Sequence, residues 1–290
     1  MMRRMTDLAG KTFVITGANS GIGKITAREI AKRGGHVILA CRSADKTQPV
    51  IDELKRETGN DKIELHQLDL SDLEAVRRSA EALLARDLPI HGLINNAGFA
   101  RGLKGPKATT KQGFEATFAT NHLGHYLFTR MLLDRIKQTK GARIVNVSSK
   151  SHYSAKKVDW DALRSPTRSL GGLDEYAVSK LANVLFTKEL ARRLEGTGVT
   201  TYAVHPGVVA TNVWRGLPAP LAWVARKFML TPEQGAHSTI TCATAPELAT
   251  ETGNYYDYDG KQRRPARLAS DDQLAKQLWT RSAEWTGLPV

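Results

Sequence analysis

Short apolar runs alternate with amphipathic segments along most of this 290-residue chain. The first run, residues 12–16, is β-branched and lacks alternating polar positions, which is typical of a strand buried on both faces of a parallel sheet. This pattern predicts strands over residues 12–16, 36–40, 63–68, 89–94, 143–147, 199–204 and 253–257.

The segments between these strands repeat apolar residues at helical spacing and predict helices. We expect helices over residues 22–31, 44–58, 72–85 and 111–137, around Tyr176 up to about 194, and from about 231. Pro49 interrupts the second helix early. Strands alternating with helices predict an α/β fold: a Rossmann-type, doubly wound, mainly parallel sheet of about seven strands, with helices on both faces. No break marks a second domain, so residues 1–290 are expected to form one unit.

Two irregular stretches, residues 150–174 and 208–230, exceed the usual length of connections in a compact domain. The second follows Pro206-Gly207, and its own glycine and prolines discourage one continuous helix. We predict that 208–230 is a mobile lid over the substrate; a rigid packed helix and a membrane-interface anchor are the alternatives. The apolar residues that need a cover are Trp214, Leu217, Leu221, Trp223 and Phe228.

Composition is ordinary for a globular protein, with 41% hydrophobic and 24% charged residues. No apolar run reaches the roughly 18 residues of a membrane span, so no transmembrane anchor is expected. The two cysteines, Cys41 and Cys242, do not suggest a disulfide framework. We therefore expect a cytoplasmic location.

The net charge of +13 does not identify a partner by itself. The positive residues are dispersed, without zinc-finger spacing or an RNA-binding aromatic signature, so no nucleic-acid partner is expected. A polyanionic cofactor is the simpler explanation. His122 and His125 lie three residues apart, but no carboxylate or cysteine completes a metal-binding pattern, and no metal site is expected.

A glycine-rich run, TGANSGIG, joins the first strand to the first helix at residues 16–23. Its glycines permit a tight turn and let backbone amides approach a pyrophosphate at the helix N-terminus, where the helix dipole favours an anion. The spacing is G-x-x-x-G-x-G, and a strand-to-helix turn without a ligand is the alternative. The candidate cofactor ligands in this glycine turn are Gly17, Asn19, Ser20, Gly21, Ile22 and Gly23.

Tyr176 and Lys180 lie one helical turn apart, on the same face of a predicted helix. A carbonyl that accepts hydride at carbon needs a proton at oxygen, and a tyrosine near a lysine ammonium can supply it because the charge favours the phenolate. Ser149 follows the fifth strand, at the carboxyl edge where α/β sheets bind ligands. Its hydroxyl can donate to the substrate oxygen, and Ser148 is the competing candidate.

Other motifs follow in a fixed order: Asn95-Asn96-Ala97-Gly98, Asn121, the two serines, the Tyr/Lys pair and Pro206-Gly207. As a set, these resemble the short-chain dehydrogenase/reductase family, over about residues 8–285. The segments SKLANVLFT at 179–187 and TYAVHPGVV at 201–209 resemble its retinol dehydrogenase-like branch. The resemblance implies hydride transfer from the pro-S face of a nicotinamide cofactor and a homodimer or homotetramer.

The resemblance also implies individual roles. Tyr176 would donate or accept the proton, Lys180 would be its electrostatic partner and a ligand of the nicotinamide ribose, and the second serine, Ser149, would contact the substrate. Asn121 would hold a proton-relay water; a polar residue at a local helix distortion is the alternative. Further cofactor ligands implied by the family pattern are Asp69, Leu70, Asn95, Ala97, Gly98, Pro206, Gly207, Val209 and Thr211.

The end of the second strand bears on the choice of cofactor. An NAD-specific enzyme would place Asp or Glu here for the adenosine ribose, whereas this chain has Cys41-Arg42. The Arg42 guanidinium suits the 2′-phosphate of NADP, and a solvated loop charge is the alternative. We predict that NADP(H) is preferred over NAD(H).

The sequence therefore predicts an NADP(H)-dependent enzyme that interconverts a small apolar carbonyl, an aldehyde or ketone, and its alcohol, with Tyr/Lys acid–base catalysis. One alternative is a C=C reductase resembling the light-driven protochlorophyllide reductases. Another is a non-catalytic NADP(H)-sensing protein, although a pure sensor has no need of the acid–base set at Asn121, Ser149, Tyr176 and Lys180.

Overall fold

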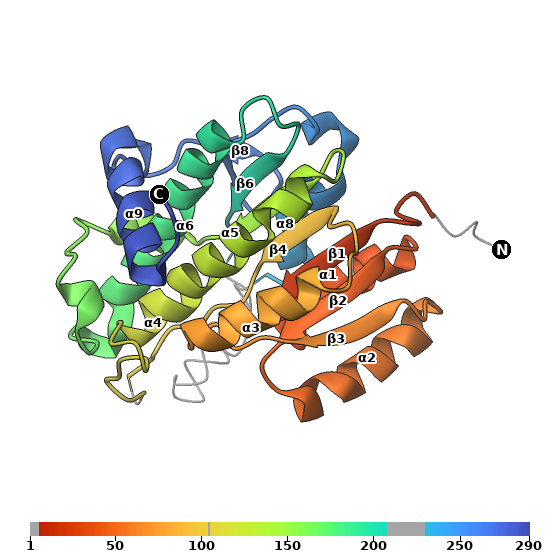
Figure 1. The fold of residues 1–290 in the computed structure, drawn as a ribbon, viewed down its shortest axis with the longest axis horizontal. Coiled ribbons are helices and arrows are strands. Elements are labelled where there is room, and N and C mark those ends of the chain that lie inside the picture. The colour runs from red at the N-terminus through yellow and green to blue at the C-terminus, as the bar shows by residue number, and fades with distance from the viewer. Residues whose placement is uncertain (1–5, 104, 208–229) are drawn as a thin grey trace.

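The computed structural model describes residues 6–103, 105–207 and 230–290, and the eight strands in these ranges form one sheet (Figure 1). The strand order is β3-β2-β1-β4-β5-β6-β7-β8, parallel from β3 to β7 and antiparallel between β7 and β8. The strands are β1 (Thr12–Thr16), β2 (His36–Cys41), β3 (Ile63–Gln67), β4 (Gly92–Asn95), β5 (Arg143–Val147), β6 (Thr200–Val204), β7 (Asn254–Tyr256) and β8 (Gln262–Arg263).

Helices connect the parallel strands and cover both faces of the sheet. Their caps follow from sequence: Ser43, Asp72, Thr231 and Asp271 each accept a backbone N–H at a helix start. The helices are α1 (Gly21–Lys32), α2 (Ala44–Thr58), α3 (Leu73–Leu84), α4 (Ala116–Phe118), α5 (Gly124–Lys137), α6 (Leu173–Arg193), α8 (Pro232–Thr244) and α9 (Asp272–Thr286).

Two hydrophobic cores lie on opposite faces of the sheet, because successive strand side chains point to opposite faces. In β1, Val14 belongs to one core and Phe13 and Ile15 to the other. The first core contains apolar side chains of α3, α5, α6 and α9, and the second contains those of α1, α2 and α8. The predicted doubly wound α/β fold is confirmed.

The strand order reverses direction at the sheet centre, where β1 lies between β2 and β4. The connection after β1 leads to one side of the sheet, and the connection after β4 leads to the other. Such a switch point opens a crevice at the carboxyl ends of the two strands, which is where doubly wound sheets bind ligands. The glycine turn follows β1, and residues 96–98 follow β4.

Several predicted elements differ from the structure. The sheet has eight strands where about seven were predicted, since β8 pairs beyond β7. The helix expected over 111–137 begins at Ala116 and contains a π-helical segment, Ala119–Leu123. The second helix continues through Pro49. The irregular stretch 150–174 contains three short 3₁₀ turns, and it ends where α6 begins at Leu173.

Candidate active site

The glycine turn packs against the end of β4 more closely than any side chain would allow. Gly17 has φ of +64°, and a Cβ there would lie 2.9 Å from the Cα of Ala97. A Cβ on Gly23 would lie 2.5 Å from Asn96 Nδ2 and 2.7 Å from the Gly17 carbonyl oxygen. Both glycines are therefore required by sterics, and the turn and the β4 end form one unit.

Hydrogen bonds between Thr16 and the segment after β4 hold this unit together. Thr16 Oγ1 accepts from the backbone N–H groups of Asn96 and Ala97, each at 2.9 Å. Asn96 Nδ2 donates to the Thr16 carbonyl at 2.8 Å. His125 Nε2 lies 2.8 Å from Thr16 Oγ1 and extends the network to α5.

The N-terminus of α1 has the features of an anion site. Its N-cap residue, Ser20, is extended and makes no side-chain capping bond, and the first turn contains no acidic residue. The amides of Gly21, Ile22 and Gly23 are therefore not capped by a side chain of the helix start, and Gly21 has φ of +53°. Asn19 is partly exposed and Ser20 is exposed beside them. This donor set fits the pyrophosphate of a dinucleotide.

Residues at the ends of β2 and β3 occupy different environments. Arg42 is exposed directly after β2, whereas Cys41 is buried under the glycine turn. Burial raises the pKa of the Cys41 thiol, although hydrogen bonds from Thr47 and the turn amides oppose it. Asp69 Oδ1 accepts from Ser71 N at 3.0 Å and Ser71 Oγ at 2.6 Å, and Leu70 is buried. Among these residues, Arg42 is thus exposed, Asp69 is partly exposed, and Cys41 and Leu70 are buried.

Lys180 is a buried cation beside Tyr176. Its Nζ donates to the Val147 carbonyl at 3.0 Å and lies 5.6 Å from the centroid of the Tyr176 ring. Burial lowers the pKa of Lys180 to about 8. Asn183 Nδ2 donates to the same Val147 carbonyl at 3.1 Å, so the end of β5 is anchored on α6 by two side chains.

Tyr176 and Ser149 face each other across the candidate site. Burial raises the pKa of the Tyr176 hydroxyl, and a hydrogen bond with the Ser149 side chain opposes that shift. Ser149 is the N-cap of the 3₁₀ turn Lys150–Ser154, and its Oγ accepts from Ser151 N at 3.2 Å. Both side chains remain partly exposed, as contact with a substrate requires.

The neighbouring Ser148 has a different environment. It is buried, its Oγ donates to the Lys180 carbonyl at 2.7 Å, and its backbone N–H donates to Val204 at 2.7 Å. Its hydroxyl therefore joins β5 to α6. Of the two serines, Ser149 is the one whose side chain reaches Tyr176.

Asn121 lies in the π-helical segment, a type of distortion that is frequent at functional sites. Its side chain exchanges two 2.9 Å hydrogen bonds with the backbone of Phe99, and its Nδ2 also donates to Ser179 Oγ at 3.0 Å. The Asn121 carbonyl faces His125 Nδ1 at 3.0 Å. The Asn121 side chain thus fixes the segment after β4, and its carbonyl lies on the His125 network.

The segment after β4 reaches the catalytic side chains. A Cβ on the exposed Gly98 would lie 3.2 Å from both Asn121 Oδ1 and Lys180 Nζ. Asn95 is instead buried, and its Nδ2 donates to Thr129 and Asn146 within the interior. The Asn95 side chain therefore joins β4 to α5 and β5 in the interior.

The structure describes the third side of the candidate site only in part. Pro206 is buried after β6, and Gly207 has φ of +81°. Val209, Thr211 and the predicted lid up to residue 229 lie outside the described residues. Within the described ranges, no group of three His, Cys, Asp or Glu side chains could hold a metal ion, and no helix is long and apolar enough to cross a membrane.

Sequence reasoning missed several residues that support this site. The sequence presents His125 only as a possible metal ligand, yet its ring connects Thr16 Oγ1 to the Asn121 carbonyl. Asn183 shares the Val147 carbonyl with Lys180, and its position three residues after Lys180 on the same helix face was a usable signal. Asn96 was read only as part of a motif, although its amide joins the two strand ends.

Comparisons with known proteins identify the family of the chain. A family model described as short chain dehydrogenase matches residues 11–160. The chain is 44% identical to human retinol dehydrogenase 12, over 99% of this chain and 89% of that protein, and 42% identical to human retinol dehydrogenase 13, over 97% and 86%. A crystal structure of a protein from Mycobacterium paratuberculosis superposes with a TM-score of 0.78 at 33% identity, covering 99% of this chain and 97% of the other.

Proposed function

Because this chain belongs to the short-chain dehydrogenase/reductase family, in its retinol dehydrogenase-like branch, we propose that it uses NADP(H) to interconvert apolar carbonyls and alcohols. Its class, an oxidoreductase acting on CH–OH and C=O groups, follows from that membership. The cofactor preference, the catalytic roles and the substrate class are the proposal. The observation that carries it is the contact of Ser149 with Tyr176, beside the buried amine of Lys180.

Tyr176, Ser149 and Lys180 have different roles in the reduction of the substrate carbonyl. The Tyr176 hydroxyl delivers the proton during reduction, and the Ser149 hydroxyl donates a hydrogen bond to the oxygen as charge develops on it. Partial burial raises the pKa of the Tyr176 hydroxyl and makes it a weak acid. We assign to the Lys180 ammonium, 5.6 Å from the centroid of the Tyr176 ring, the stabilisation of the phenolate that the proton transfer leaves. The nicotinamide cofactor, when bound, supplies the hydride.

The glycine turn and the α1 N-terminus would hold the pyrophosphate of this cofactor. Their uncapped amides favour an anionic group, and the close approach of Gly17 to Ala97 fixes the turn that presents these amides. Arg42 supports NADP(H) over NAD(H), since it is exposed at the end of β2 where a carboxylate would repel the 2′-phosphate. Asp69 would act through the turn that it fixes with Ser71.

The retinol dehydrogenase relatives favour an apolar substrate such as retinal. We propose a homodimer or homotetramer in the cytoplasm, as the family resemblance and the two unpaired, buried cysteines suggest. Light scattering after gel filtration would determine the assembly.

The experiment that tests the function is a set of NADPH-oxidation assays with all-trans-retinal, nonanal, an aryl ketone and a quinone as substrates. We expect turnover with at least one of them, with an alcohol or hydroquinone as the product. Mass spectrometry of the products distinguishes the alternatives: a saturated carbonyl would indicate a C=C reductase. Tight NADPH binding without turnover of any compound would indicate a sensing protein and overturn the proposal.

A further inference from the structure

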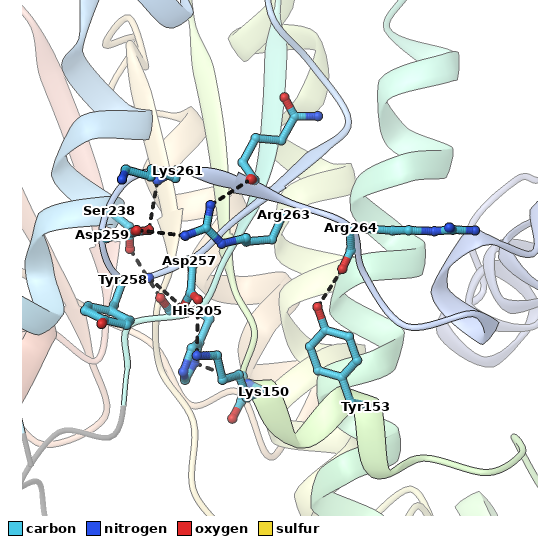
Figure 2. Close-up of polar contacts among 12 residues, drawn as sticks. Lys150, Tyr153, His205, Ser238, Asp257, Tyr258, Asp259, Lys261, Arg263 and Arg264 are labelled. Atoms are coloured by element: carbon cyan, nitrogen blue, oxygen red, sulfur yellow. Dashed lines mark hydrogen bonds and ion pairs between the residues drawn. The ribbon is translucent and has the colours of Figure 1, made fainter. Parts of the chain in front are cut away.

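The turn that carries Ser149 is attached to the C-terminal part of the sheet by three polar contacts, made by Lys150, His152 and Tyr153. Figure 2 shows those of Lys150 and Tyr153. Lys150 Nζ forms an ion pair with Asp257 Oδ2 at 3.1 Å. His152 Nε2 accepts from Ala266 N at 3.0 Å, and Tyr153 OH donates to the Arg264 carbonyl at 2.6 Å. The partners all belong to residues 257–266, the segment that forms β8 and its flanks.

The contact nearest to Ser149 joins the ends of three strands. Lys150 follows β5 by three residues, His205 follows β6 directly, and Asp257 follows β7 directly. Lys150 N donates to His205 Nδ1 at 3.2 Å, while its Nζ reaches Asp257. We name Lys150, His205 and Asp257 the strand-end clamp.

The clamp joins a half-exposed cation to a nearly buried carboxylate, since the Lys150 side chain is 53% exposed. The Asp257 side chain is only 10% exposed, and its other oxygen accepts from Tyr258 N at 2.9 Å. Burial would raise the pKa of Asp257, but the Tyr258 and Lys150 bonds hold it below its usual range, so the carboxylate stays charged. Removal of Lys150 would leave a nearly buried charge without its cation, which is costlier than loss of an exposed pair.

His205 contributes a fixed acceptor. Burial lowers the pKa of His205 to about 4, so the ring is neutral near pH 7 and its Nδ1 can accept the Lys150 N–H. Its own backbone is held as well, since His205 N donates to the Tyr256 carbonyl at 2.8 Å and Ser238 Oγ donates to the His205 carbonyl at 3.4 Å. The residue after Ser149 is thus bound at both its backbone and its side chain.

We propose that Asp257 is a positioning residue for the reaction: through Lys150 it holds the Ser149 hydroxyl where it can form a hydrogen bond with the Tyr176 hydroxyl. This inference rests on the proposed function for its kinetic readout. Lys150 and Asp257 lie 107 positions apart in sequence, and their pairing makes the short β7–β8 hairpin a part of the catalytic architecture. A small displacement of a catalytic group lowers the rate without a new energetic cost in binding the cofactor.

The test compares two aspartates of the same hairpin. Asp257 accepts a backbone N–H with one oxygen and binds Lys150 of the Ser149 turn with the other. Asp259 likewise accepts a backbone N–H with one oxygen, from Lys261 at 3.1 Å. Its other oxygen pairs with Arg263, a residue of the hairpin itself, at 2.9 Å. Asp259→Asn is therefore a matched control that weakens the hairpin without touching the Ser149 turn.

We expect Asp257→Asn and Lys150→Met each to lower kcat with NADPH and retinal, or the best substrate of the assays above, by about 10-fold. The dissociation constant of NADPH should change less than about twofold, and Asp259→Asn should retain wild-type kcat within the same margin. The double variant should lower kcat no more than either single variant does, because each substitution removes the same contact between Lys150 and Asp257. In a Ser149→Ala background, Asp257→Asn should have no further effect on kcat.

An equal loss in Asp259→Asn would mean that the hairpin acts only through stability and would overturn the proposal. Wild-type kcat in both Asp257→Asn and Lys150→Met would also overturn it. The same holds if Asp257→Asn lowers kcat further in the Ser149→Ala background.

Amide hydrogen exchange tests the clamp without any substrate. Ser151 N and His152 N donate to the side chain and the carbonyl of Ser149, at 3.2 and 3.0 Å. Exchange in residues 149–154 should accelerate in Asp257→Asn and Lys150→Met but not in Asp259→Asn. Failure of the proposed function would abolish the kinetic readout and leave this one intact, whereas unchanged exchange in the two clamp variants would refute the positioning role itself.

Discussion

The two sides of the candidate active site are held together by different kinds of interaction. On the cofactor side, missing side chains at Gly17 and Gly23 allow the glycine turn to pack on the end of β4, and neutral hydrogen bonds from Thr16 fix it. On the catalytic side, buried or nearly buried charges at Lys180 and Asp257 hold the strand ends.

This difference has a consequence for stability. Close packing and neutral hydrogen bonds stabilise the folded chain, while a buried ammonium destabilises it unless its neighbours compensate. Lys180 donates to a carbonyl and faces no carboxylate within the contacts of the described residues. The cofactor side should therefore tolerate few changes for steric reasons, whereas the catalytic side should include a residue whose removal makes the protein more stable.

The largest expected effect is on chemistry alone. Tyr176→Phe should lower kcat by at least about 100-fold, because it removes the proton donor while its ring keeps the packing against Lys180. NADPH affinity should stay nearly unchanged in a fluorescence titration. Substantial turnover by this variant, with any substrate of the wild type, would remove Tyr176 from the proposed role.

The second prediction concerns the packing on the cofactor side. Gly17→Ala should weaken NADPH binding by roughly 30-fold, since its methyl group would lie 2.9 Å from the Cα of Ala97 and push the turn away from β4. Gly10→Ala is the control: it has a similar positive φ, +78°, but no heavy atom within 4 Å of the added methyl group. Equal losses in both variants would show that backbone strain, and not the close approach, determines binding.

The sequence was most informative where local residue types decide the structure. Three elements have the predicted bounds, Thr12–Thr16, Ala44–Thr58 and Arg143–Val147, since apolar runs and caps are local signals. The glycine turn was predictable for the same reason. Its role in binding a cofactor stays a prediction.

Contacts between distant segments could not be predicted in this way. The two-residue strand β8 is exposed and polar, so no hydrophobic pattern marks it, and it forms only because β7 offers a free edge. The pair of Lys150 and Asp257 depends on the order of β5, β6 and β7 in the sheet. The family resemblance already favoured Ser149 over Ser148, but the physical reason, a buried Ser148 hydroxyl bonded to the Lys180 carbonyl, depends on how β5 and α6 pack together.

The third prediction tests the cost of the buried amine. Lys180→Met should lower turnover yet raise the free energy of unfolding at pH 7 by about 3 kcal/mol, because a pKa lowered from 10.5 to about 8 means that the folded state disfavours the charge. The Val147 carbonyl keeps a partner in Asn183. Urea denaturation of both proteins would measure the difference.

The pH dependence of this gain has a definite sign. Below pH 8, Lys180 is protonated in both the folded and the unfolded chain, so the wild type carries the full penalty. Between about pH 8 and 10.5 the unfolded chain binds the extra proton, and wild-type stability rises toward that of the variant. A difference between the two proteins that does not shrink over this range would show that packing, and not charge burial, separates them.

The smallest expected effect concerns Arg42. Arg42→Ala should weaken NADPH binding by roughly 10-fold and leave NADH binding unchanged, because a charge-assisted contact at an exposed site lies at the lower end of its usual range, about 1.5 kcal/mol. Arg56→Ala is the control, since it removes the same charge from the far end of α2. If both variants weaken NADPH equally, the net positive charge of the protein attracts the cofactor and Arg42 has no specific contact with it. If neither variant weakens NADPH binding, any preference for NADP must come from residues other than those at the end of β2.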